Sequence, residues 1–555
     1  MYKLLNGLIF KQALISGANN IVNHRQEVDA LNVFPVPDGD TGTNMSMTIS
    51  AASRELQVSE QTDIAGVSAK AAAALLRGAR GNSGVILSLI FRGISNGFKG
   101  MEEADGKALA KALELGKESA YKAVMKPTEG TILTVIRMAA EAVKGTEEAD
   151  CRTVLETAYE AAKTALAQTS EMLPVLKEAG VVDAGGQGFI FILEGMLSVI
   201  ADGKTVEPVE QLEKKETPKT DKSIVAAASG DIKFGYCSEF LINREKNAQS
   251  NAAALKAYLE SIGDCVVVVE DEDVIKVHVH SNEPGNVIQA ALKCGPLTNI
   301  KIDNMRFQHR NAELGAENAK DAIPHGEQPV KSVEPTKDYG FVSVAAGDGF
   351  VELFRELGAD NIVSGGQTMN PSTDDILSAV EATPARHVFV LPNNKNIIMA
   401  AEQTVNLADR KVSVLQTKTL TQGVSAMLSF SEGDDVETNL LNMMKAAEAV
   451  HTAQVTFAAR DSEAFGQRIK KGQILGMEDG KITLVEDDIA DAAYRTARRL
   501  VKKYNGSVIT VYYGEDTDEA TANLLTKRLA ERFPNAEINT VPGGQPVYYF
   551  IISVE

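Results

Sequence analysis

The chain is poor in cysteine and has no long apolar run. Its 555 residues include only four cysteines, which are scattered without the spacing of a disulfide framework. No apolar run approaches the ~20 residues that a membrane-spanning helix needs. The apolar N-terminal stretch Leu4–Phe10 is short, contains Asn6 and is followed by Lys11, which argues against a signal peptide. We therefore expect a cytoplasmic protein without membrane insertion.

Positive charge is also scarce, because 75 Asp and Glu residues outnumber 56 Lys and Arg residues. The net charge of −19 argues against nucleic acid as a partner, since a phosphate backbone is itself negative. Hydrophobic residues make up 44% of the chain and charged residues 24%, as in ordinary soluble proteins. The length is enough for about three or four domains, each with its own core.

Residues 1–202 are predicted to form an all-helical domain, a bundle or barrel with its special residues in the turns. Ala-rich stretches with helical spacing recur between turns that contain Gly or Pro, and no convincing β alternation interrupts them. The expected helices cover approximately residues 43–58, 61–77, 85–99, 107–124, 130–144, 151–169 and 187–200.

The remainder is predicted to hold two domains of mixed helix and strand, separated by polar linkers at 203–222 and 309–338. Residues 223–308 have the element order of a small α+β domain with a ferredoxin-like topology. In residues 339–555, strands alternate with helices, which predicts a parallel α/β sheet followed by a further α/β unit. The expected strands of that sheet lie near 340–346, 361–364, 387–391 and 412–415. The fold class is therefore multidomain α and α/β.

The most informative segment is the loop Asp38-Gly39-Asp40. Two carboxylates in a proline-braced loop can hold a hard divalent cation. An apolar stretch with helical spacing follows, and the free N–H groups at a helix start favour phosphate. A simple tight turn is the alternative, because Asp and Gly are common turn formers.

Three familiar metal- or phosphate-binding motifs do not match this chain. An EF-hand that began at Asp38 would have Gly42 and Ile49 at its fifth and twelfth positions, where it needs oxygen ligands. A phosphatase nucleophile loop should follow a strand, but here Pro35 and Pro37 precede it. A P-loop that ended in Gly203-Lys204-Thr205 would need a leading glycine where the chain has Ser198.

Three further glycine-bearing turns open predicted helices in the same domain, where backbone N–H groups are free. Each alone is compatible with an ordinary capped turn. If they meet the Asp38 loop at one end of the domain, they would form one phosphate site. The turns are Gly81-Asn82-Ser83-Gly84, Gly130-Thr131 and Asp183-Ala184-Gly185-Gly186.

Taken in order, these segments resemble the nucleotide-binding L-subunit of dihydroxyacetone kinase over about residues 1–200. That resemblance implies a barrel of helices with ATP and two magnesium ions in its mouth. It implies that Asp38 and Asp40 are the catalytic, magnesium-coordinating residues. The positions that it assigns to nucleotide binding are Thr41, Thr43, Asn44, Met45, Asn82, Ser83, Gly84, Gly130, Thr131, Asp183, Ala184 and Gly185. Two positions depart from the family: Asn32 replaces a third acidic ligand, and Lys177 replaces an arginine.

The whole chain resembles the ATP-binding component of bacterial fatty acid kinase more closely still. This resemblance implies a kinase subunit that phosphorylates the carboxylate of a fatty acid to give an acyl phosphate for phospholipid metabolism. It also implies a separate fatty-acid-binding carrier protein and a homodimer. A glycerone-type small-molecule kinase and a non-catalytic scaffold that senses Mg-ATP are the alternatives. The glycerone reaction needs a partner that holds the ketone on a histidine, and none is fused here.

Two features of the later domains carry further predictions. His278 and His280 are two apart on a predicted strand, so they face one side of it, and with Cys237 they could give zinc three ligands. A buried cysteine with two surface histidines is the alternative, and the resemblance favours zinc. The segment Gly365–Ser372 precedes a helix with acidic residues in its first turn, which favours capping. It also partly resembles the Thr-Ser-x-Pro-Ser loop with which DegV-type lipid-binding proteins hold a fatty-acid carboxylate. For the C-terminal half as a whole, partner docking or dimerisation is the expected role.

Overall fold

The computed structural model describes residues 3–32, 39–124, 126–208, 234, 236–243, 252–270, 274–304, 333–366, 369–464 and 467–555. The chain divides into two compact units, one formed by Met1–Glu216 with Pro329–Glu555 and the other by Thr217–Gln328. The described elements confirm the predicted combination of an all-helical part with α+β and α/β parts.

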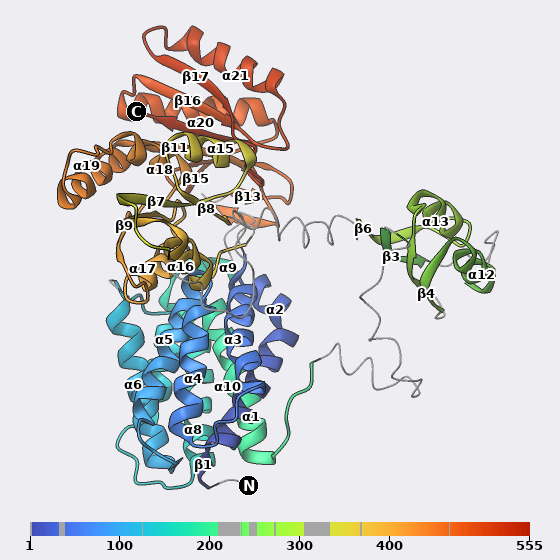
Figure 1. Cartoon of the computed structure of the whole chain (residues 1–555), viewed down its shortest axis with the longest axis vertical. Helices are drawn as coiled ribbons and strands as arrows, with labels where there is room; N and C mark the ends of the chain where they lie inside the picture. Colours follow the sequence, from blue (N-terminus) through green and yellow to red (C-terminus); the bar gives the residue numbers. More distant parts are fainter. Residues whose placement is uncertain are drawn as a thin grey trace. The chain divides into compact units, whose positions relative to one another are not determined.

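The N-terminal part of the first unit is helical, apart from the paired two-residue strands β1 (Leu5–Asn6) and β2 (Glu103–Ala104). Its long helices lie side by side around one apolar core (Figure 1). The helices are α1 (Gly7–Asn23), α2 (Arg25–Ala30), α3 (Thr41–Gln57), α4 (Ile64–Arg77), α5 (Gly81–Gly97), α6 (Gly106–Ala123), α7 (Ile132–Ala142), α8 (Cys151–Met172), α9 (Pro174–Ala179) and α10 (Ala184–Asp202).

Helices α1 and α10 depart from the sequence-based expectations. The expected helices did not include α1, which packs closely on α10 at two glycines. A Cβ on Gly17 would lie 2.8 Å from the Ile192 carbonyl oxygen, and a Cβ on Gly195 would lie 2.6 Å from that of Ser16. In addition, α10 is long and apolar enough to cross a membrane, with a mean hydropathy of 1.5, although no such run was expected. Because 72% of that stretch is buried inside the protein, α10 has the burial of a core helix.

The C-terminal part of the first unit contains the predicted parallel sheet, with strand order β10-β9-β7-β8. Crossover helices connect its strands, as parallel pairing requires. The elements are β7 (Lys337–Ala345), α15 (Asp348–Glu356), β8 (Asn361–Ser364), α16 (Thr373–Ala382), β9 (Ala385–Leu391), α17 (Ile398–Thr404), β10 (Lys411–Val414), α18 (Leu420–Leu428) and α19 (Val436–Ala449).

A second, mixed sheet with strand order β15-β14-β11-β18-β16-β17 completes this part of the chain. Only β16 and β17 pair in parallel within it. The elements are β11 (His451–Phe457), the hairpin β12 (Ser462–Ala464) and β13 (Gln467–Ile469), β14 (Ile474–Glu478), β15 (Lys481–Glu486), α20 (Ile489–Tyr504), β16 (Val508–Tyr513), α21 (Glu519–Arg532), β17 (Glu537–Pro542) and β18 (Phe550–Val554).

Apolar packing joins the helical and α/β parts of the first unit. Val85 and Leu89 of α5 belong to the same buried cluster as Val342 of β7 and Ile376 of α16. Helices α16 and α17 contact α4 and α5 (Figure 1). The two parts therefore share a core, and residues from both can reach one site.

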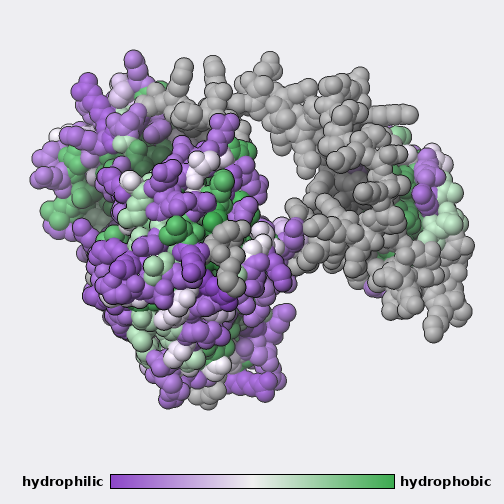
Figure 2. Space-filling view, turned by 90° about the horizontal axis from the view of Figure 1, so that it is seen from below, coloured by the Kyte–Doolittle hydropathy of each residue, from purple (hydrophilic) through white to green (hydrophobic). Residues whose placement is uncertain are grey.

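The outer surface seen in Figure 2 is mostly hydrophilic, with smaller apolar patches.

The second unit contains a four-stranded antiparallel sheet with strand order β4-β5-β3-β6. Its βαββαβ element order and its strand order are those of a ferredoxin-like fold, as predicted. The elements are β3 (Tyr236–Asn243), α12 (Ala252–Ile262), β4 (Gly263–Glu270), β5 (Val274–Ser281), α13 (Pro284–Ala291) and β6 (Leu297–Asn304).

Candidate active site

The starts of α3, α5, α7 and α10 meet around one pocket in the helical domain. Its volume is about 760 Å³ including the open mouth. The condition that the separate turns converge is therefore met, although convergence alone assigns no role to any residue. The predicted nucleotide-binding residues that line this pocket are Thr41, Asn82, Ser83, Thr131, Asp183, Ala184 and Gly185.

The other predicted residues that the structure describes, Asp40 among them, do not line this pocket. Asp38 falls outside the described residues. Thr43 and Asn44 lie in the first turn of α3, and Asn44 is buried. The side chain of Met45 is fully buried in the core against Gly188, so it supports the start of α3 from behind. A Cβ on Gly84 would lie 2.3 Å from the Thr48 hydroxyl oxygen, so this glycine brings α5 close to α3.

Asp40 is the N-cap residue of α3, yet its carboxylate makes no cap hydrogen bond. Asp29, from α2, caps the helix in its place: its two oxygens accept from the Thr43 N–H at 3.0 Å and from the Thr43 hydroxyl at 2.8 Å. The carboxylate of Asp40 instead accepts from the Asn370 amide nitrogen at 2.6 Å. An N-cap aspartate normally binds the N–H of the second or third helical residue, so Asp29 relieves Asp40 of that role.

Sequence reasoning missed Asp29 and Asn370. Asp29 lies on a six-residue helix with no apolar periodicity, so no local pattern marks it. The sequence indicates Asn370 only as part of a capping segment. Both residues act through contacts that are distant along the chain, and a single sequence gives no signal for such contacts.

The two departures from the kinase pattern can be located. The side chain of Asn32 meets the Thr41 hydroxyl oxygen at 3.0 Å. With its amide turned so that the oxygen faces the loop, it also accepts from the N–H groups of Asp40 and Thr41 at 3.2 Å. Asn32 thus supports the helix start as a neutral group. Lys177 is an exposed residue that pairs with Glu171 at 2.6 Å, whereas Lys126 lines the pocket.

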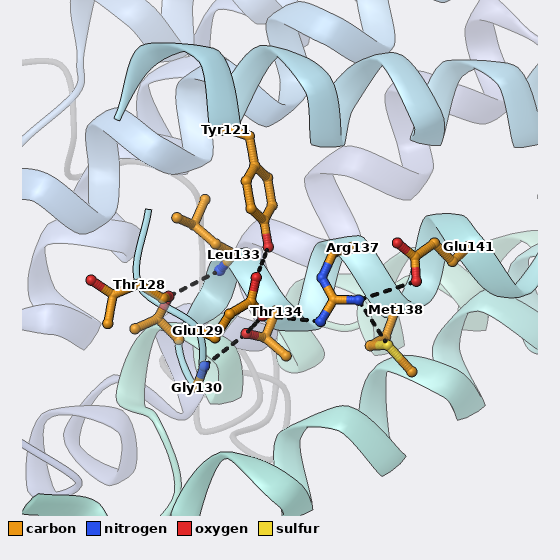
Figure 3. A network of polar contacts seen from close by, with 10 residues as sticks. Tyr121, Thr128, Glu129, Gly130, Leu133, Thr134, Arg137, Met138 and Glu141 are labelled. Atoms are coloured by element: carbon orange, nitrogen blue, oxygen red, sulfur yellow. Dashed lines mark hydrogen bonds and ion pairs between the residues drawn. The ribbon is translucent and has the colours of Figure 1, made fainter. Parts of the chain in front are cut away.

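A polar network holds the turn before α7 (Figure 3). The Thr134 hydroxyl accepts from the Gly130 N–H at 2.8 Å and donates to the Glu129 carboxylate at 2.6 Å. Tyr121 and Arg137 also donate to Glu129, at 2.9 and 3.0 Å. Burial would raise the pKa of Glu129, but these hydrogen bonds outweigh it and lower that pKa. The network fixes Gly130, next to the pocket-lining Thr131.

Asp183 caps α10 through a hydrogen bond of 2.7 Å from the Gly186 N–H. Burial disfavours its carboxylate and raises its pKa to about 6, although N–H groups of Gly186 and Ile132 partly offset this effect. An acid that titrates near neutral pH at the wall of a cleft is a candidate functional group, although structural groups show such shifts too.

Two oxygen donors at the starts of α3 and α5 bear on the predicted metal, the carboxylate of Asp40 and the amide of Asn82. The amide oxygen of Asn82 is buried without a hydrogen-bond partner among the described residues. Carboxylate and amide oxygens are the ligands that Mg²⁺ prefers in proteins. Mg²⁺ is commonly held by one or two carboxylates together with substrate phosphates, so Asp40 is compatible with this metal. Because the described residues contain no group of three His, Cys, Asp or Glu residues that could hold a metal ion, magnesium binding by Asp40 stays a prediction.

The predicted zinc ligands lie in the second unit. The backbone register pairs Cys237 of β3 with His280 of β5, and Glu239 with His278. The side chains of Cys237 and His278 fall outside the described residues. Among the described residues, no group of three His, Cys, Asp or Glu residues could hold a metal ion. Zinc therefore has no support beyond this register and stays a prediction.

The segment before α16 caps that helix, which is the role that its sequence favours. The Ser372 hydroxyl accepts from the Asp375 N–H at 3.1 Å, and the Asp375 carboxylate accepts from the Ser372 N–H at 2.7 Å. This reciprocal pair is a capping box. A separate pocket of about 480 Å³ lies beside Gly365 and Gly366. Nothing in its lining assigns it to a lipid.

Comparison with known proteins covers nearly the whole chain. The DAK2 domain family matches residues 35–198, and two FakA-like families of fatty acid kinase, the middle domain and the C-terminal domain, match residues 233–312 and 340–555. Protein YloV of Bacillus subtilis is 39% identical over the full length of both chains. An uncharacterized protein of Staphylococcus epidermidis is 36% identical, also over both full lengths.

Solved structures add a partial likeness to the C-terminal half. A fatty-acid-binding DegV family protein from Thermus thermophilus matches with 16% identity and a TM-score of 0.30, over 39% of this chain and 99% of that chain. This TM-score is low, so the assignment depends on the sequence relatives.

Proposed function

The chain belongs to the FakA-like family of fatty acid kinase proteins, and from this premise we propose that it phosphorylates the carboxylate of a fatty acid with ATP. Its domains are those of a kinase-type phosphotransferase, and the family predicted from the sequence is confirmed. The observation that carries the proposal is the pocket, because helix starts from four distant segments converge there beside Asp40.

In this proposal the residues around the pocket have separate roles. Asp38 and Asp40 hold Mg²⁺, which when bound neutralises charge on the phosphates during transfer. The N–H groups at the start of α5, which has no side-chain cap, bind the phosphates together with the hydroxyls of Thr41 and Ser83. Thr131 and Asp183 border the rest of the nucleotide. Catalysis then depends mainly on holding both reactants in line.

The acceptor needs no general base from the protein. A fatty acid carboxylate is already an anion at neutral pH. One of its oxygens forms a bond to the terminal phosphorus of ATP while the bond from that phosphorus to the ADP oxygen breaks, so the products are an acyl phosphate and ADP. The family consists of kinase subunits, which supports an enzyme of several components. We propose that a separate carrier protein presents the fatty acid.

The test is formation of acyl phosphate, trapped as the hydroxamate, from ATP with free long-chain fatty acids and with fatty acids loaded on a purified fatty-acid-binding protein. The double variant Asp38→Asn/Asp40→Asn should lose at least about 100-fold in rate. Asp105→Asn is the matched control, because Asp105 caps α6 at the Ala108 N–H, away from the pocket. Product formation that survives the double substitution contradicts the metal site. Binding of ATP without turnover of any fatty acid indicates a sensor instead.

A further inference from the structure

Asn370, from the α/β part of the chain, reaches Asp40 in the helical part. Its amide nitrogen donates to the Asp40 carboxylate at 2.6 Å, across 330 residues of sequence. Asn370 is only 1% exposed. A hydrogen bond to an ionised acceptor is shorter and stronger than a neutral one, and burial protects it from competition by water. This contact therefore fixes the orientation of Asp40.

The backbone of Asn370 is itself anchored to the helical domain. Its carbonyl oxygen accepts from the Arg80 guanidinium at 2.7 Å, and the same guanidinium lies 3.3 Å from the Asp375 carboxylate. One residue before Arg80, the Ala79 carbonyl oxygen accepts from the Thr373 N–H at 3.0 Å. These contacts bind the segment that carries Asn370 to the residues immediately before α5, so Asn370 cannot shift without breaking them.

The amide of Asn370 also lies against the first turn of α5. Gly81 has φ +56°, and a Cβ there would lie 2.6 Å from the Asn44 amide nitrogen and 3.3 Å from that of Asn370. Gly81 directly precedes Asn82 and Ser83, which line the pocket. Asn370 thus lies between the Asp40 loop and the turn before α5, two of the segments that surround the pocket.

The donor that Asn370 offers to Asp40 is a neutral amide, although a cation lies beside Asn370. Arg80 is the cation beside Asn370, but its guanidinium is bound to a carbonyl oxygen and to Asp375. From Asn370, Asp40 receives a neutral amide donor, which orients the carboxylate without cancelling its charge. The other amide atom of Asn370, the oxygen, is buried without a hydrogen-bond partner among the described residues. A buried acceptor without a partner is costly, so this arrangement has a cost that packing alone does not explain.

We propose that Asn370 is a positioning residue of the kinase site, which orients Asp40 toward the metal and makes the C-terminal domain part of that site. The inference rests on the proposed function for its reaction, but the orientation of Asp40 can be tested by cation binding without turnover. The helical domain by itself would then hold Asp40 in several orientations and bind the metal more weakly.

The test uses the full-length chain and Asn370→Ala. Binding of a non-hydrolysable ATP analogue is titrated at a series of Mn²⁺ concentrations, and acyl phosphate formation is measured at a series of Mg²⁺ concentrations. We expect Asn370→Ala to need about 10- to 100-fold more metal in both assays, as for other residues that orient metal ligands. Analogue binding in the absence of metal should be unchanged. If Asn370 had a purely structural role, its loss would weaken analogue binding with and without metal alike.

Two further variants complete the test. Asn361→Ala is the control, since Asn361 makes a comparable part-buried bond of 2.8 Å to Thr383 within the C-terminal domain, and its metal dependence should match the wild type. If Asn370→Ala does not fold, Arg80→Lys replaces it, because a lysine cannot span both the Asn370 carbonyl and Asp375; its metal requirement should rise in the same direction.

The outcomes separate the inference from the proposed function. If the wild type is active and Asn370→Ala has the same metal dependence as the wild type, the inference alone is overturned. If Asn370→Ala raises the Mn²⁺ concentration needed for analogue binding but the wild type forms no acyl phosphate, the proposed function alone is overturned. A wild type without any Mn²⁺-dependent binding of the analogue overturns both.

Discussion

The carboxylate of Asp29 caps helix α3 at Thr43, although Asp29 lies on a different helix. Its oxygens accept from the Thr43 N–H and hydroxyl at 3.0 and 2.8 Å. We predict that Asp29→Ala costs about 1 kcal/mol of stability, the usual cost of a lost cap. The variant should also raise the metal concentration needed for ATP-analogue binding, because Asp40 can then turn back to cap its own helix. Urea unfolding and Mn²⁺ titration measure the two effects.

Asp105→Ala is the matched control for this prediction. Asp105 caps α6 with a bond of 2.9 Å to the Ala108 N–H, so the stability loss should be similar while the metal dependence stays that of the wild type. A stability loss in Asp29→Ala without any change in metal dependence would mean that Asp29 is a helix cap and nothing more.

Two features of position 130 require glycine: a positive φ, and neighbouring side chains that leave no room for a Cβ atom. Its φ is +84°, and a Cβ there would lie 2.8 Å from Leu173 Cγ and 2.9 Å from Met172 Cβ. We predict that Gly130→Ala destabilises the protein and weakens ATP binding, because its neighbour Thr131 lines the pocket. Gly145 has φ +68°, and a Cβ there would meet no atom within 4 Å, so Gly145→Ala measures the strain of positive φ alone.

The difference between these two variants isolates the steric clash. Positive φ costs a non-glycine residue about 1–2 kcal/mol, and overpacking typically adds about 1–3 kcal/mol. Gly130→Ala should therefore unfold at a lower urea concentration than Gly145→Ala. Equal midpoints for the two variants would show that Leu173 and Met172 move aside without cost.

The general architecture was predictable from the sequence because amphipathic periodicity and strand-helix alternation are local signals. Helix α1 was missed because Gly17 and neighbouring asparagines are poor helix formers. Its stability comes from close packing on α10, which only the folded chain reveals. The convergence of the turns around the pocket could not be predicted either. The sequence identified each turn, but no local pattern fixes the distances between them.

The residues that support Asp40 could not be predicted for a related reason. Asp29 and Asn370 act on the α3 start from 14 and 330 residues away. Their types are ordinary for a polar helix and a capping loop, so an ordinary structural role was the natural interpretation. Sequence reasoning found the group that faces the ligand, whereas the groups that orient it depend on tertiary contacts.

Zinc binding in the second unit remains testable by metal analysis. Backbone register pairs Cys237 with His280, so we predict about one zinc per purified chain and its loss in Cys237→Ser. Cys294→Ser is the control, because Cys294 is a buried member of the core of the same unit. If the wild type holds no zinc after reconstitution, or if Cys294→Ser loses as much as Cys237→Ser, the predicted site does not exist.

Asp183 should make stability depend on pH in the opposite direction from an ordinary helix cap. Burial raises its pKa from 3.8 to about 6 in the folded chain. Between these values the folded protein holds a proton that the unfolded chain has released, so stability falls as pH rises through this window and is level above it. Asp183→Asn retains an oxygen for the Gly186 N–H but does not titrate. Relative to this variant, the wild type should lose up to about 3 kcal/mol between about pH 4 and pH 7.

Asp518 provides the comparison of opposite sign. It caps α21 at the Thr521 N–H at 2.7 Å, and hydrogen bonds from Thr521 lower its pKa below 3.8. Relative to Asp518→Asn, the wild type should therefore lose stability as pH falls below about 4. Urea unfolding of both pairs across a pH series gives the two profiles. Parallel profiles for the wild type and Asp183→Asn would mean that the carboxyl of Asp183 is hydrated in solution. In that case it would be ionised throughout the range in which ATP binds, and its charge would act on the nucleotide directly.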